Sequence, residues 1–255
     1  MITKTNTKLK RLIKEMKPGA IVLSSWLKQI GISGDLQKYY VNSGWLESLD
    51  RGVFKKPDDN INWQGAVYAL QQQAGKKVIV GATTALSLLG FAHYIHFEDD
   101  ILFIFSPERE RLPQWFTNIA QGNKIVHKQT NFIPIETALT KFENDYFDIK
   151  ISSPERAILE TIFLYPGHID LIETFHILEG MVNLRPKVLQ ELLMVCKSVK
   201  VKRIFLYMAD KLQHQWFNFL NIENIDMGKG DRQITPGGAY NSKYKITLPK
   251  ELIDL

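Results

Sequence analysis

The chain has 255 residues, of which 45% are hydrophobic and 11% aromatic, so it is long enough to bury a sizeable core and to form two domains. No apolar run reaches the roughly 18–20 residues of a membrane span, and the basic start lacks the apolar stretch of a signal peptide, which predicts a soluble cytoplasmic protein. The single cysteine, Cys196, excludes a disulfide within the chain and lies in an apolar pattern typical of a buried side chain.

Positive charge is concentrated at the start of the sequence. Residues 1–57 contain eleven Lys and Arg against four Asp and Glu, a net charge of +7, whereas the other 198 residues carry −2 within the total of +5. Such a segment is typical of a module that neutralises phosphates. Lysines on the solvated face of an ordinary helix give the same count, so the local pattern has to distinguish the two.

The first 43 residues predict three helices. Residues 6–16 place apolar side chains at helical spacing on one face and cations on the other, and Pro18-Gly19 ends this helix. Ser24 is a candidate N-cap for a short second helix, and Gly31 supplies the turn after it. Ser33 is a candidate N-cap for the third helix, which extends to about residue 43.

The third helix and the residues after it suggest a binding surface. At 100° per residue, Leu36, Tyr39, Tyr40 and Ser43 fall on one side of this helix, and Gln37, Lys38, Val41 and Asn42 fall on the other. Alternating apolar and polar residues on either side of Asp50-Arg51-Gly52 then predict a two-stranded ribbon with Arg51 at its tip. A ribbon directly after a helix-turn-helix predicts a winged helix.

For this winged helix-turn-helix domain, residues 1–57, we predict contacts to double-stranded DNA. The candidate residues are Ser33, Gln37 and Lys38 on the third helix, with Arg51 and Lys55 on the ribbon. A winged helix that binds another protein is the alternative, and the concentrated charge favours DNA.

Residues 58–255 predict a larger C-terminal domain that is mixed, mostly helical and contains a small sheet, so the whole chain is α+β. Helices are expected at 61–73, 82–89, 169–179, 186–195 and 201–219, and strands at 101–105, 124–127 and 146–151. A further helix starts in "ISSPERAILE", with either Ser152 or Ser153 as its N-cap. A loop, "DMGKGDRQITPGGAY", and a strand, "YKITLP", follow the helices.

No catalytic or metal motif is complete, so we predict neither an enzyme nor a cofactor. The segment "HYIHFEDD" supplies His93, His96, Asp99 and Asp100 without the spacing of a zinc helix motif, and a nuclease site there lacks its second acid and lysine. The glycine-rich loop around Lys229 and Arg232 lacks the Walker pattern of a phosphate loop.

Four segments in this order carry a family resemblance: "GISGDLQKYYVNSGWLESLDRGVFKKP", "GATTALSLLG", "ISSPERAILE" and "GKGDRQITPGGAYNSKYKITLPKEL". Together they resemble the AbiEi family of antitoxins and transcriptional regulators from bacterial type IV toxin–antitoxin and abortive-infection systems, over nearly the whole chain. The resemblance implies a winged helix that binds operator DNA and represses its own operon. It also implies a C-terminal antitoxin domain that counters a nucleotidyltransferase-like toxin.

Within that domain, Lys229 and Arg232 are candidate antitoxin residues, because exposed cations in a glycine-rich loop suit an acidic or phosphorylated partner. Ordinary solvated loop charges are the alternative. For the whole protein, a one-component regulator whose C-terminal domain senses a small ligand remains a second hypothesis, and a nuclease using the acids around Asp99 a third. An adjacent toxin gene would favour the antitoxin.

Overall fold

The computed structural model describes residues 2–91, 101–120 and 123–255 and divides into two compact units. The first unit comprises Met1–Val78, Arg109–Ile125 and Lys141–Lys150, and the second comprises Ile79–Glu108, Val126–Thr140 and Ile151–Leu255. In the described ranges, no helix combines the length and apolar character needed to cross a membrane.

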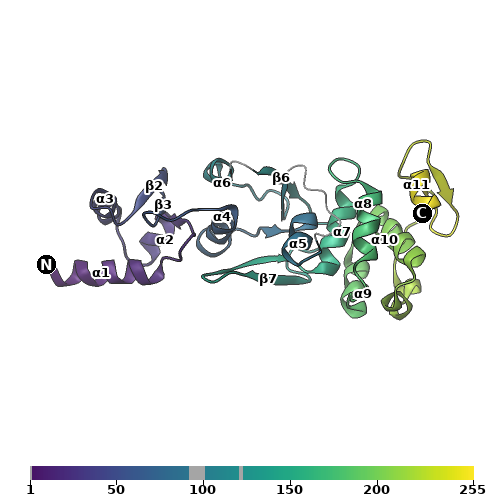
Figure 1. Cartoon of the computed structure of the whole chain (residues 1–255), viewed down its shortest axis with the longest axis horizontal. Coiled ribbons are helices and arrows are strands. Elements are labelled where there is room, and N and C mark those ends of the chain that lie inside the picture. Colours follow the sequence, from purple (N-terminus) through teal and green to yellow (C-terminus); the bar gives the residue numbers. More distant parts are fainter. Residues whose placement is uncertain (1, 92–100, 121–122) are drawn as a thin grey trace. The chain divides into compact units, whose positions relative to one another are not determined.

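The first unit opens with three helices and a three-stranded sheet (Figure 1). The elements in chain order are α1 (Ile2–Glu15), β1 (Val22–Leu23), α2 (Ser24–Gln29), α3 (Gly34–Asn42), β2 (Glu47–Asp50) and β3 (Val53–Lys55). Strand β3 lies between β1 and β2 and pairs antiparallel with both. The turn of the β2–β3 ribbon is formed by Arg51 and Gly52.

These elements share one hydrophobic core. Its buried side chains are Leu12, Met16, Val22, Leu27, Ile32, Tyr40, Leu46 and Phe54. The helical spacing of Leu12 and Met16 accounts for the way α1 faces this core, because residues four apart lie on the same side of a helix. Since every member of the cluster lies within residues 1–57, this segment has a core of its own.

The first unit nevertheless continues beyond residue 57. Helix α4 (Trp63–Tyr68) runs into a π-helical turn, η1 (Ala69–Gln73), and the buried amide of Gln73 donates to the carbonyl of Ile21 (2.7 Å) and accepts from the N–H of Leu23 (2.8 Å). Gly65 is required, because a Cβ atom there would lie 1.9 Å from a backbone oxygen of the segment before β1. Close backbone packing therefore ties this helix to β1.

A five-stranded sheet forms the middle of the chain. Its strands are β4 (Ile79–Val80), β5 (Ile101–Ser106), β6 (Lys124–Gln129), β7 (Leu139–Glu143) and β8 (Asp148–Ser152), in the order β6-β5-β4-β8-β7. Strand β4 pairs antiparallel with β5 and parallel with β8. The continuous apolar run of β5 is buried, as expected for an interior strand. Helix α5 (Ala82–Leu88) packs on β5, and α6 (Gln114–Ile119) belongs to the first unit.

Four helices dominate the second unit. They are α7 (Pro154–Leu164), α8 (Leu171–Glu179), α9 (Pro186–Val195) and α10 (Val199–Leu212), and α7 packs against the other three (Figure 1). Every side chain of α10 from residue 201 to residue 209 is buried, so α10 is a central helix. The short 3-10 helices η3 (Gln215–Phe219) and η4 (Ile222–Asn224) follow it.

The chain ends in a third small sheet with a short helix. Strands β9 (Arg232–Gln233), β10 (Ala239–Asn241) and β11 (Ile246–Leu248) have the order β10-β11-β9, and α11 (Lys250–Asp254) follows them. Strand β11 pairs antiparallel with β10 and parallel with β9. The loop between η4 and β9 is therefore fixed at its far end by a sheet.

The predicted mixture of helices and small sheets is confirmed. Of the two N-cap candidates before α7, Ser153 occupies the N-cap position with Pro154 after it, but the Ser153 hydroxyl donates to Glu155 and caps no backbone N–H. Strands β4 and β7 were not predicted, because short runs give little periodic signal. The compact units do not divide at residue 57. The end of the DNA-binding segment at residue 57 stays a prediction.

Candidate nucleic-acid interface

The outer face of α3 is formed by Asp35, Lys38, Tyr39 and Asn42, all of which are exposed. Their spacing of three and four residues places them on one side of the helix. Tyr39 has 57% of its surface exposed, and Ser33, at the N-cap, is exposed as well. The face thus presents a cation, a phenol, an amide and a carboxylate to solvent.

Gln37 does not belong to this face, and its predicted outward position is wrong. Its side chain is 3% exposed. Its amide nitrogen donates to the carbonyls of Ile32 (3.0 Å) and Ser24 (3.3 Å), and its amide oxygen accepts from the Ser24 hydroxyl (2.7 Å). Because both ends of the amide are occupied, Gln37 joins α3 to the start of α2 and has no free group for a base edge.

We expect Gln37→Leu to lower the free energy of unfolding by about 1–3 kcal/mol, because buried partners such as the Ile32 carbonyl lose their hydrogen bond. Urea unfolding followed by tryptophan fluorescence measures this change. The exposed neighbour provides the control: Lys38→Ala should change stability by less than about 0.5 kcal/mol. If Gln37→Leu is as stable as wild type and binds DNA with an altered sequence preference, Gln37 contacts a base and the structural role is wrong.

The ribbon carries one exposed cation at its tip and one that is already occupied. Arg51 is exposed in the turn between β2 and β3. The Lys55 ammonium lies 3.1 Å from the Glu47 carboxylate and donates to the Asp59 carbonyl (3.0 Å), and 15% of its side chain is exposed. The predicted phosphate contact of Lys55 is therefore not supported, because its ammonium group already pairs with Glu47 across the ribbon.

The loop before β9 is held in place by a buried cation. Arg203 of α10 is 1% exposed, and its guanidinium donates to the carbonyls of Met227 (2.8 Å), Gly228 (3.2 Å), Gly230 (2.7 Å) and Lys245 (2.9 Å). Carbonyl dipoles replace water around this guanidinium, which is how a buried charge is tolerated. The guanidinium of Arg203 therefore holds the loop backbone against α10.

Of the two predicted antitoxin residues, Lys229 lies on this loop and Arg232 directly follows it, and both are exposed. Lys229 lies between the two glycines whose carbonyls Arg203 binds, and Arg232 begins β9. Nothing in the sequence pattern pointed to Arg203, because a cation within a long helix usually faces solvent.

Two of the sequence segments singled out above form a single buried network in the second unit. Arg156 donates to Glu160 (2.7 Å) and to three carbonyls of the segment before β7, and both residues are at most 1% exposed. Glu160 also accepts from the Ser152 hydroxyl (2.6 Å) and the N–H of Ala82 (3.1 Å). The segments "GATTAL" and "SSPERAILE" thus meet at one carboxylate, which indicates a structural role.

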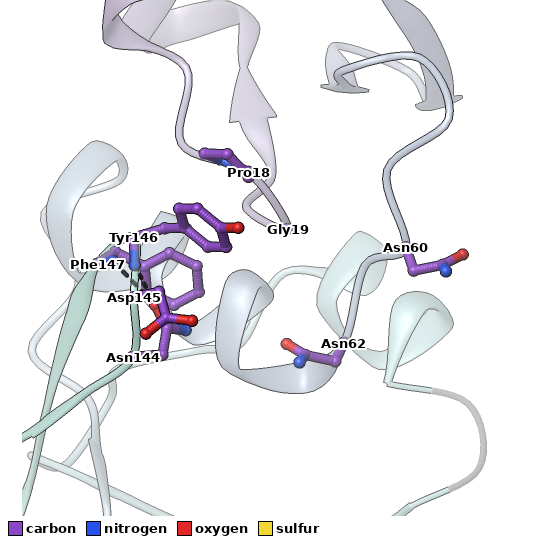
Figure 2. Close-up of a pocket in the computed structure, with 8 residues that line it drawn as sticks. All are labelled: Pro18, Gly19, Asn60, Asn62, Asn144, Asp145, Tyr146 and Phe147. Carbon is purple, nitrogen blue, oxygen red and sulfur yellow. Dashed lines mark hydrogen bonds between the residues drawn. The ribbon is translucent and has the colours of Figure 1, made fainter.

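A pocket of about 280 Å³ lies in the first unit (Figure 2). It is lined by Pro18, Gly19, Asn60, Asn62, Asn144, Asp145, Tyr146 and Phe147. Asn144 accepts from two backbone N–H groups of its own turn, and Asn62 accepts from the N–H of Gly65. The side-chain oxygens of Asn62 and Asn144 therefore cap backbone turns, which gives both residues a structural role.

Metal ligands do not gather elsewhere either: within the described ranges, no three His, Cys, Asp or Glu side chains form a metal-binding group. The residues His93, His96, Asp99 and Asp100 of the metal and nuclease hypotheses lie outside the described residues.

Comparison with known proteins gives a consistent assignment. A crystal structure of the RV2827C protein from Mycobacterium tuberculosis superposes with a TM-score of 0.62 at 14% identity, covering 98% of this chain and 94% of that one, which shows a shared fold. No curated protein matches. Two protein-family models match the sequence. The family model described as "Transcriptional regulator, AbiEi antitoxin N-terminal domain" matches residues 5–97, and the family model described as "Transcriptional regulator, AbiEi antitoxin, Type IV TA system" matches residues 99–249. The chain therefore belongs to the AbiEi antitoxin family of transcriptional regulators of type IV toxin–antitoxin systems.

Proposed function

We propose that this protein represses its own operon by binding operator DNA and acts as the antitoxin against a nucleotidyltransferase-like toxin. In this proposal, residues 1–57 are a winged helix in which α3 enters the major groove and the β2–β3 ribbon is the wing. The order helix, strand, helix, helix, ribbon supports this reading, as does the separate core of the segment. The observation that carries it is the exposed polar face of α3, together with an exposed Arg51, in a segment of charge +7.

The exposed residues have different roles in this proposal. Lys38 and Arg51 contact phosphates, which positions the domain without reading sequence. Asn42 and Tyr39 reach base edges, since an asparagine amide pairs with the N6 and N7 atoms of adenine. Ser33, at the start of α3, contacts the backbone of the DNA.

Arg51→Ala and Lys38→Ala are expected to weaken binding to every DNA sequence and to reduce the salt dependence by about one unit of slope each. Asn42→Ala should instead cost about 1–3 kcal/mol on operator DNA alone. Fluorescence anisotropy with labelled operator and scrambled duplexes at several salt concentrations measures both effects. Lys187→Ala, an exposed cation on α9, is the matched control and should bind as wild type does. Arg51→Ala with wild-type affinity and slope would contradict the wing.

For the antitoxin activity, we expect Lys229→Ala combined with Arg232→Ala to reduce protection of cells that express the cognate toxin. Lys229 lies on a loop whose backbone is fixed by Arg203, and Arg232 begins the strand after it, so little ordering entropy opposes a contact there. Colony counts on toxin induction give the measurement, with Western blots to confirm equal protein levels. Full protection by the double variant would exclude this loop from the activity.

A further inference from the structure

Two further cations lie over the ring of Phe163, close to the start of α10. The ammonium groups of Lys128 and Lys200 lie over the Phe163 ring, 5.6 Å and 5.7 Å from its centroid. The ring of Phe132 stacks on Phe163 at 4.1 Å with an interplanar angle of 11°. Lys197 follows α9, is exposed, and donates its backbone N–H to the Phe132 carbonyl (2.8 Å).

In the described part of the chain, these charges have no acidic partner. Lys200 donates to the carbonyls of Phe163 (3.1 Å) and Tyr165 (2.5 Å), and among the described residues no carboxylate forms an ion pair with Lys128, Lys197 or Lys200. Burial, together with repulsion from Lys128, lowers the pKa of Lys200. Holding like charges around one ring costs free energy, which a bound anion would offset.

The glycine-rich loop lies beside the same helix start. A Cβ atom on Gly228 would come within 2.9 Å of the Val199 side chain, so the loop backbone contacts the first residue of α10. Further along, the hydroxyls of Thr235 and Tyr165 are 2.8 Å apart, and Tyr165 also supplies a carbonyl to Lys200. These contacts place the loop that carries Lys229 next to the lysines around Phe163.

We propose that Lys128, Lys197 and Lys200, extended by Lys229, form a binding surface for a phosphate-bearing ligand. The two ammonium groups over Phe163, with the exposed Lys197 and Lys229 on adjoining segments, suit a compact anion with more than one charge, because phosphate oxygens accept from several donors. Phe132 covers one face of Phe163 and the lysines lie over the ring, so the site contacts phosphates and does not stack a base. The inference extends the proposed antitoxin surface and rests on the proposed function only for its biological role.

The test is isothermal titration of the full chain with pyrophosphate. Wild type is expected to bind, and Lys128→Gln with Lys200→Gln should weaken binding by about 10-fold or more, because two charge-assisted contacts are lost. Lys187→Gln, at the opposite end of α9 from Lys197, is the control and should leave binding unchanged. Lys128 is exposed, so Lys128→Gln alone still tests the site if the double variant fails to fold.

Further titrations identify the source of the phosphate. A short single-stranded RNA that loses affinity in the double variant, in parallel with pyrophosphate, indicates a nucleic-acid backbone; loss of pyrophosphate binding alone indicates a free phosphorylated ligand. Equal pyrophosphate affinity in wild type and double variant, or binding of a polyglutamate peptide without pyrophosphate, overturns the proposal. Operator binding by the double variant should stay at the wild-type level, so a failure here is distinguishable from a failure of the DNA-binding function.

Discussion

Replacing Glu160 by alanine is expected to lower the free energy of unfolding by about 3–5 kcal/mol, because Arg156 would remain buried without its carboxylate. The same change removes the acceptor of the Ser152 hydroxyl and of the Ala82 N–H. Chemical denaturation at neutral pH measures the loss. Glu191→Ala, at an exposed position on α9, serves as the control.

Gly81→Ala tests the same geometry from the other side. A Cβ atom at Gly81 would lie 2.2 Å from a Glu160 carboxylate oxygen and 2.7 Å from the Phe105 ring, so the substitution should also destabilise the second unit. If Glu160→Ala loses less than about 1 kcal/mol, the two segments do not depend on this carboxylate.

Acidification is expected to remove about 2–3 kcal/mol of stability through Glu155. Burial raises the pKa of this carboxyl, but hydrogen bonds from the side chain and backbone of Arg185 and from Ser153 outweigh it and lower the pKa from 4.5 to about 2. The folded state thus binds the proton less tightly than the unfolded chain does. This contribution is complete above about pH 4.5 and is lost as the pH falls towards 2.

Arg185→Met separates this pair from the other carboxylates. Because 60% of the Arg185 side chain is exposed, solvent screens its charge and keeps the contribution of the pair to about 2–3 kcal/mol. The variant should be less stable at pH 7 and should lose less stability between pH 5 and pH 2.5 than wild type does, as measured by urea unfolding at each pH. Identical pH profiles for the two proteins would rule out the Glu155–Arg185 pair as the cause.

Sequence patterns predicted the helices and strands whose ends and faces depend on residues close together in the chain. Helix α9 matches its predicted range because Pro186 begins it and its apolar residues keep a helical spacing. The ribbon follows from alternation on either side of Arg51-Gly52. The exposed positions of Lys38, Arg51, Lys229 and Arg232 also agree with expectation, since charged loop and helix residues usually face water.

The side-chain positions that sequence patterns did not predict depend on contacts with residues elsewhere in the chain. Gln37 and Tyr39 exchanged their expected places, because the Ser24 hydroxyl and the Ile32 carbonyl offer the Gln37 amide a set of partners that periodicity does not show. Lys55 is occupied by Glu47 across the ribbon. The role of Arg203 depends on carbonyls 24 to 42 residues away in the chain.

Autorepression is tested by binding of the purified protein to the DNA just upstream of its own gene, compared with scrambled DNA of equal length at two salt concentrations. We predict tighter binding to the upstream DNA, weakened in Arg51→Ala and losing its preference for the upstream sequence in Asn42→Ala. Equal binding to both DNAs, or no binding to either, would contradict autorepression and leave the β2–β3 ribbon and α3 as a surface for protein contacts.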